Sequence, residues 1–130
     1  MLTLKRRPYS RSTRHALSFV AGLVLLGNRE SKKLQKNTYL IVLDRNTLGV
    51  RYHDTIIVQI HSDDTYTLNT GGWKTVSTKS RINTWSPAGI YQEDFVWYIG
   101  NHFYYDGIKV DAWGRKSFDP AYPDARRKVA

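Results

Sequence analysis

The stretch TYLIVLDRNTLGVRYHDTIIVQIHSDDTYTLN, residues 38–69, decides the fold. Apolar and polar residues alternate along it, and β-branched and aromatic residues dominate, which is the pattern of strands that bury one face. The pattern predicts four strands, at residues 38–43, 48–52, 55–60 and 65–69. The residues expected to face the core in the last two strands are Ile56, Val58, Ile60, Tyr66 and Leu68.

A second group of short strands is predicted downstream, after a helix. The Gly71-Gly72-Trp73 junction ends the first group, and a short helix is expected to begin at Ser77 or Thr78 and to end before Pro87. An antiparallel meander is then predicted, because turn pairs separate three short segments rich in aromatic residues. These segments are residues 89–92, 95–99 and 102–105.

Upstream of the first strand, an apolar run follows a basic segment. A helix is predicted from Ser12 or Thr13 to Leu26, with Gly27 as its stop. The same region imitates a secretory signal, but it has no small-x-small cleavage site. Its apolar part, 16–26, is also shorter than the roughly 20 residues that span a bilayer. We therefore favour a helix of the folded domain and no membrane span. A cleaved signal and a helix lying on a membrane surface or a partner are the alternatives.

These elements predict an α+β fold: a mainly antiparallel sheet of five to seven strands, one N-terminal helix packed on it, and a short helix after Gly-Gly-Trp. The 130 residues are enough for one domain. We place that domain at residues 15–113, between a basic N-terminal arm at 1–14 and a basic C-terminal tail at 114–130. The chain has no cysteine, which excludes disulfides and thiolate metal sites.

Positive charge is concentrated at both ends of the chain. Residues 1–36 contain nine of the twenty Lys and Arg residues against one acid, and residues 115–130 contain five more against two acids. Such clusters gain affinity for phosphates by displacing condensed counterions. The residues of these basic arms expected to contact a polyanion are Lys5, Arg6, Arg7, Arg11, Arg14, Lys32, Lys33, Arg126, Arg127 and Lys128. Basic ends that only aid solubility, or that pack within a larger particle, are the alternative.

The segment GGWKTVSTKSRIN, residues 71–83, is the strongest local signal for a binding site. Two glycines permit close approach of the backbone, and the start of the following helix presents unpaired N–H groups and a partial positive charge. The predicted phosphate-binding residues around it are Lys74, Thr75, Ser77, Thr78, Lys79 and Arg81. In the alternative interpretation the glycines form a turn, Ser77 or Thr78 caps the helix, and the cations are solvated.

Eight aromatic residues lie between Tyr91 and Trp113. Because successive residues of a strand point to opposite faces, some of these rings are expected on each side of the sheet. Exposed rings would be stacking platforms for bases. The candidates for exposed rings are Trp73, Tyr98, Tyr104 and Trp113. Packing of the rings between sheet and helix is the alternative.

Histidine and aspartate residues do not form a recognisable catalytic pattern. His53 and His61 flank one predicted strand and are too far apart to share a metal ion. His102 and Asp106, in a tight predicted hairpin, are the one near pair. We therefore assign no catalytic residue, no metal ligand and no cofactor, and an enzyme is the least favoured class.

Residues 37–87, above all NTLGVRYHDTIIVQIHSDDTYTLNTGGWKTVSTKSRIN, resemble a group of small proteins of tailed bacteriophages for which no function is established. The shared features are an Asn-Thr-Tyr strand, a His-Asp-Thr strand opening and the pattern GGWxTVxTKxRIN. The resemblance implies a viral source and a site of action in the cytoplasm of an infected bacterium, or in the virion. It implies no activity.

The leading functional hypothesis is non-catalytic binding of nucleic acid, or of another acidic partner, by a small phage protein with basic arms around an aromatic-rich β domain. The first alternative is an inhibitor that binds and blocks a host or anti-phage defence protein through the aromatic strands. The second alternative is a structural component of the virion. The sequence leaves the oligomeric state open.

Overall fold

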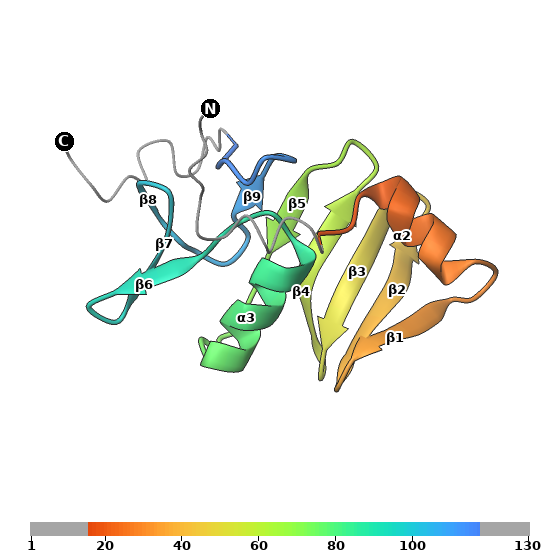
Figure 1. Ribbon diagram of the computed structural model, residues 1–130, viewed down its shortest axis with the longest axis horizontal. Coiled ribbons are helices and arrows are strands. Elements are labelled where there is room, and N and C mark those ends of the chain that lie inside the picture. The colour runs from red at the N-terminus through yellow and green to blue at the C-terminus, as the bar shows by residue number, and fades with distance from the viewer. Residues whose placement is uncertain (1–15, 118–130) are drawn as a thin grey trace, which may run out of the picture.

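A computed structural model describes residues 16–117 of the chain. The predicted N-terminal arm, 1–14, and residues 118–130 of the predicted tail lie outside this range. The described residues form two helices and nine strands, which confirms a mainly antiparallel α+β fold (Figure 1). The strands belong to a six-stranded sheet and a three-stranded sheet, whereas the sequence predicted a single sheet.

The six-stranded sheet is antiparallel throughout, in the order β1-β2-β3-β4-β5-β9. Its strands are β1 (Ser31–Gln35), β2 (Thr38–Asp44), β3 (Thr47–Tyr52), β4 (Thr55–His61), β5 (Tyr66–Leu68) and β9 (Lys109–Val110). The four strands predicted from residues 38–69 are confirmed. Strand β1 was not predicted, because its sequence SKKLQ has no β-branched or aromatic residue. Lys32 and Lys33 therefore lie in an edge strand of the sheet and not in an arm.

A β-bulge decides which residues of β4 reach the core. Val50 of β3 pairs with Val58, but Arg51 pairs with Ile56, so Ile57 is the extra residue in β4. Ile57 is fully buried, and Ile56 lies on the opposite face of the sheet. The prediction that Ile56 shares the core face with Val58 is therefore wrong, because strict alternation does not continue through a bulge.

Helix α2 (Phe19–Leu26) packs on the core face of the sheet, as predicted. Ser18 is its N-cap, with the side-chain oxygen accepting from the Ala21 N–H at 3.0 Å. The predicted cap residues Ser12 and Thr13 lie outside the described range. Gly22 lets the helix approach β3 closely, since a Cβ there would lie 2.5 Å from the Leu48 side chain.

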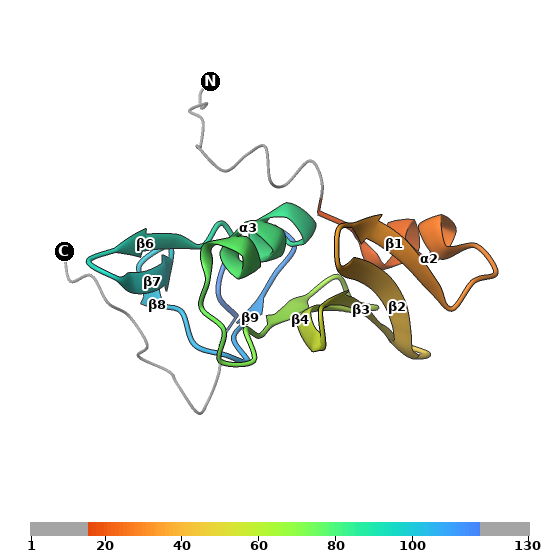
Figure 2. The same cartoon turned by 90° about the horizontal axis from the view of Figure 1, so that it is seen from below.

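Helix α3 (Val76–Trp85) follows the Gly-Gly-Trp junction and lies on the same face of the large sheet as α2 (Figure 2). Its N-cap is Thr75, so the prediction of Ser77 or Thr78 as the cap is wrong. Ile82 is fully buried, and the half-buried Trp85 donates its indole N–H to the Gln35 side chain at 2.7 Å. The helix ends before Pro87, as predicted.

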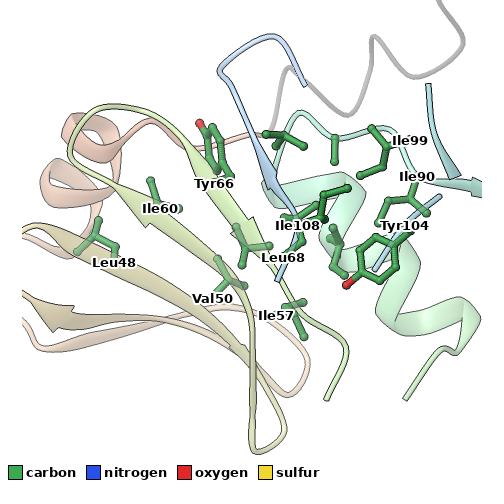
Figure 3. Packing of buried hydrophobic residues seen from close by; sticks show 14 of the residues in the cluster. Leu48, Val50, Ile57, Ile60, Tyr66, Leu68, Ile90, Ile99, Tyr104 and Ile108 are labelled. Atoms are coloured by element: carbon green, nitrogen blue, oxygen red, sulfur yellow. The ribbon is translucent and has the colours of Figure 1, made fainter. Parts of the chain in front are cut away.

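The small sheet continues the core at the other end of the molecule. Its strands are β6 (Tyr91–Glu93), β7 (Val96–Ile99) and β8 (His102–Phe103), paired in that order. Ile99 and Tyr104 join Leu68 and Ile108 in one buried cluster that extends across both sheets (Figure 3). The two sheets and both helices therefore share a single hydrophobic core.

Residues 114–117, placed in the basic tail by the sequence, are part of this fold. Gly114 is buried and has a φ of 84°, and Lys116 forms a β-bridge with Val110. The Asp111 N–H donates to the Arg115 carbonyl at 2.9 Å, which closes a turn. The folded domain therefore extends at least to residue 117.

Candidate functional site

A pocket of about 480 Å³ opens where the β3–β4 turn, the Gly-Gly-Trp junction and the start of α3 meet. Three aromatic rings line it, those of Tyr52, His53 and Trp73. Hydroxyl groups come from four threonines, Thr55, Thr70, Thr75 and Thr78. The pocket can accept a flat ring with polar edges, because it combines ring faces with hydrogen-bonding groups.

The aromatic side of this pocket is fixed by local backbone geometry. His53 has a φ of 54°, and its ring centre lies 4.4 Å from that of Tyr52, at an interplanar angle of 44°. Trp73, by contrast, has 69% of its surface exposed. The indole face of Trp73 is therefore open to a ligand.

A hydrogen-bond network centred on Asp106 anchors the chain just before the Gly-Gly-Trp junction. One carboxylate oxygen of Asp106 accepts from the Thr70 N–H at 2.8 Å and from the Tyr104 hydroxyl at 2.7 Å, and the other accepts from the Thr70 hydroxyl at 2.9 Å. Partial burial alone would raise the pKa of Asp106. These hydrogen bonds and the charge of Lys74 outweigh burial and lower the pKa below its ordinary value. Asp106 is thus an ionised anchor of the turn.

Most of the hydroxyl groups predicted to bind phosphate instead form hydrogen bonds at the N-terminus of α3. The Thr75 side chain accepts from the Thr78 N–H at 3.1 Å and donates to the Thr78 hydroxyl at 3.0 Å. Thr78 is buried, and Ser77 is exposed on the first turn of α3. The start of α3 is therefore capped by Thr75, and not by Ser77 or Thr78 as in the alternative interpretation of this segment.

The three cations predicted at the same site point in different directions. Lys79 donates to the Gln92 side chain at 3.0 Å and lies 5.6 Å from the Trp97 ring centre, toward the small sheet. Arg81 contacts Thr38 and the carbonyl of Lys36, toward the large sheet. Lys74 lies 5.9 Å from the Tyr104 ring centre. None of the three lines the pocket.

Two of the four aromatic candidates are exposed and two are buried. Trp113 has 75% of its surface exposed and, like Trp73, is available for stacking. Tyr98 is 4% exposed and Tyr104 is 5% exposed, so the prediction that they form surface platforms is wrong. Tyr98 packs between Tyr91 and Phe103, with ring centres 5.5 and 5.6 Å away.

The prediction missed Phe95, which is 94% exposed. Its φ is 68°, in the turn between β6 and β7, so its side chain projects from the tip of the hairpin. The turn pair Glu93-Asp94 immediately before it was the available signal, because a residue in a hairpin tip has no sheet face to pack against. The sequence pattern instead placed Phe95 inside the strand.

A second pocket of about 480 Å³ lies beside Trp113. The β7–β8 turn, at Gly100 and Asn101, forms one wall, and residues 113–116 form the other. Arg115 and Lys116 line it, and so does His102. Unlike the first pocket, this one therefore brings two cations next to an exposed indole.

The three described histidines, His53, His61 and His102, do not converge on one site within residues 16–117. The His61 Nε2 atom lies 2.7 Å from the Thr67 hydroxyl, and partial burial and nearby Lys109 lower the pKa of His61, against smaller opposing effects of Asp63 and Asp44. The hydrogen bonds of Asp106 go to Thr70 and Tyr104. Among residues 16–117 no group of three or more His, Asp and Glu side chains could hold a metal ion.

Most of the described cations have no acidic partner within residues 16–117. The salt bridge between Arg115 and Asp111, at 3.1 Å, is the single ion pair within residues 16–117. The carboxylates of the described part of the chain therefore leave its other Lys and Arg side chains unneutralised by close contact. Their charge can act on an external ligand.

Comparison with known proteins identifies a viral family. The sequence model of the family described as Kyanoviridae Gp96 protein matches residues 24–118. No curated protein and no solved structure matches the chain. Neither α2 nor α3, the helices of the described residues, has the length and apolar content needed to cross a bilayer. The match covers all nine strands and α3, so the chain belongs to the Kyanoviridae Gp96 family of phage proteins.

Proposed function

We propose that this phage protein binds nucleic acid without catalysing a reaction, in the cytoplasm of the infected bacterium. The observation that carries the proposal is the pair of exposed indoles, Trp73 and Trp113, on a chain with a formal charge of +9 and a single ion pair within residues 16–117. Aromatic rings that stack on bases, combined with cations that neutralise phosphates, are the two requirements for binding single strands without sequence preference.

The face of the large sheet that neither described helix covers supports the same function. Both described helices lie on the other face (Figure 2). Lys33, Tyr39 and Arg51 are direct partners across β1, β2 and β3, so their side chains share this face. The Arg51 guanidinium lies 5.3 Å from the Tyr39 ring centre. A nucleic-acid backbone can follow this row, because strands spaced about 4.8 Å apart place Lys33 and Arg51 roughly 10 Å apart.

The test is a titration of the full chain into a labelled oligonucleotide, followed by fluorescence anisotropy. The Trp73→Ala variant should bind about 5- to 150-fold more weakly, in line with the 1 to 3 kcal/mol that a stacked base contributes. Val76→Ala is the matched control, since Val76 is also exposed and lies three residues away. The proposal is wrong if the unmodified chain binds neither single-stranded nor duplex oligonucleotides at low salt.

A second candidate function is inhibition of a host or defence protein, and the outer surface of α2 favours it. Val20, Leu23 and Val24 are exposed on this helix, with 67%, 44% and 76% of their surfaces accessible. They are spaced three and four apart and so form one apolar stripe. A host protein retained by the chain after nuclease treatment, and lost in the Val20→Ser/Val24→Ser double variant, would favour this function over the first. If the host protein were lost in the Trp73→Ala variant instead, the result would not favour inhibition over nucleic-acid binding.

A further inference from the structure

We infer that the pocket beside Trp113 holds one unstacked nucleotide of a single-stranded nucleic acid, with its base on the indole and its phosphate near Arg115 and Lys116. The inference rests on the proposed function and assigns the class of nucleic acid. It also gives the second pocket a role that the sequence did not suggest, because the sequence analysis placed Arg115 and Lys116 in a basic C-terminal tail.

The backbone at Trp113 is held in place before any ligand arrives. Asp111 accepts from the backbone N–H groups of Trp113 and Arg115, each at 2.9 Å, and this fixes the turn. The Arg115 guanidinium lies 5.5 Å from the Trp113 ring centre. A turn that is already ordered loses little backbone conformational freedom when a base stacks on its exposed ring, which favours binding.

The charge of the pocket suits a phosphate. Arg115 and Lys116 line it, and no carboxylate is found among the described residues of its lining. The bond between Arg115 and Asp111 is largely solvent-exposed, with 73% of the arginine side chain accessible, so it is weak and leaves the guanidinium able to engage a phosphate oxygen. Lys116 donates to the Ser117 carbonyl at 3.1 Å and has no acidic partner among the described residues.

An unsatisfied polar atom adds an independent observation. The Nδ1 atom of His102, which lines this pocket, is buried and has no hydrogen-bond partner among the described residues. Buried polar atoms are nearly always paired, so a base edge that reaches this nitrogen after a rotation of the imidazole would supply the missing partner. The volume of about 480 Å³ lies within the range of small-ligand pockets.

These features select single strands. A base inside a duplex is stacked on both sides, and its faces are not accessible to an indole. A base in a single strand or a loop can turn out and lie on Trp113 while the flanking phosphates stay near the cations. We therefore expect the Trp113 pocket to contribute to the binding of single strands and not to that of duplexes.

The experiment compares two oligonucleotides, a single strand and the duplex of the same sequence, titrated with the full chain by fluorescence anisotropy. Trp113→Ala should weaken single-strand binding about 5- to 150-fold and leave duplex binding unchanged, and Trp113→Phe should retain most of the affinity. Phe95→Ala is the matched control, because Phe95 is an exposed ring at the tip of another hairpin.

Three results would overturn the inference. Equal single-strand affinity of Trp113→Ala and the unmodified chain would place the bound nucleotide elsewhere while leaving the proposed function intact. Equal losses in Trp113→Ala and Phe95→Ala would point to a non-specific effect of removing surface rings. Absence of binding by the unmodified chain would overturn the proposed function, and this inference with it.

Discussion

The guanidinium of Arg81 lies over the ring of Tyr52, with its Cζ atom 4.3 Å from the ring centre. The same side chain donates to the Thr38 hydroxyl at 2.8 Å and to the Lys36 carbonyl at 3.1 Å. Arg81 therefore ties α3 to the ends of β2 and β3. With the Ser77 carbonyl, to which it donates at 3.5 Å, this cation expected from the sequence to meet a phosphate has four partners inside the protein.

Replacing Arg81 should consequently affect stability more than ligand binding. Arg81→Ala is expected to lower the free energy of unfolding by about 1 to 3 kcal/mol, through loss of the ring contact and of the hydrogen bonds. Arg81→Lys should not restore it, because an ammonium group cannot stack and donate in two directions as a guanidinium does. Urea unfolding measures both. Unchanged stability together with weaker oligonucleotide binding would contradict this prediction and indicate that Arg81 binds a phosphate.

The Asp106 network predicts a dependence of stability on pH. The pKa of Asp106 is below its ordinary value of 3.8 in the folded chain. Its contribution is therefore fully present above that value and is lost as the pH falls through the lowered pKa. Asp106→Asn should lower the free energy of unfolding at pH 7 by about 1 kcal/mol or more. The difference in free energy of unfolding between the unmodified chain and Asp106→Asn should become smaller below about pH 4. A constant difference in urea unfolding from pH 7 to pH 3 would contradict this.

Gly114 is expected to tolerate no side chain. Its φ is 84°, and an added Cβ would overlap the carbonyl group of Pro87, which is backbone and cannot rotate away. Gly107 is a matched control, since its φ is 93° and nothing lies within 4 Å of an added Cβ. Both alanine variants carry the strain of a positive φ, about 1 kcal/mol. The free energy of unfolding of Gly114→Ala should fall clearly below that of Gly107→Ala; equal values would mean that residues 111–117 do not pack as described.

The N-cap of α3 predicts that Thr75 and Ser77, two neighbouring hydroxyl residues, differ in their contribution to stability. Thr75→Ala should lower the free energy of unfolding by about 1 kcal/mol, because it leaves the Thr78 N–H without an acceptor. Ser77→Ala should change it by less than about 0.5 kcal/mol, since Ser77 is exposed. Thermal unfolding of the two variants decides between them, and a larger loss from Ser77→Ala would reassign the cap.

The strands were predictable from the sequence where alternation is strict, as in Tyr66 and Leu68. Prediction failed where tertiary context overrides the local pattern. The bulge at Ile57 moves Ile56 off the expected core face of β4, and no local signal marks it, because Ile56 and Ile57 are both β-branched. Strand β1 is polar and is held by its pairing with β2.

The candidate site was predictable in its location but not in its chemistry. The Gly-Gly-Trp junction does border a pocket, yet residue types alone could not tell that Thr75 and Thr78 bond to each other. Burial of an aromatic ring depends on its neighbours in space, which separates Tyr104 from Trp113 although both belong to the same set of aromatic residues between Tyr91 and Trp113. The Trp113 pocket brings residues 99–102 and 113–116 together by tertiary packing, and sequence spacing does not reveal such a contact.

The dependence of oligonucleotide affinity on salt tests the central claim most directly. Single-strand binding by the full chain should show log K falling linearly with log salt concentration, with a slope of about −4 if roughly six phosphates are neutralised. Such a slope is expected because the Lys and Arg side chains replace condensed counterions. An affinity that does not change between low and high salt would contradict the account.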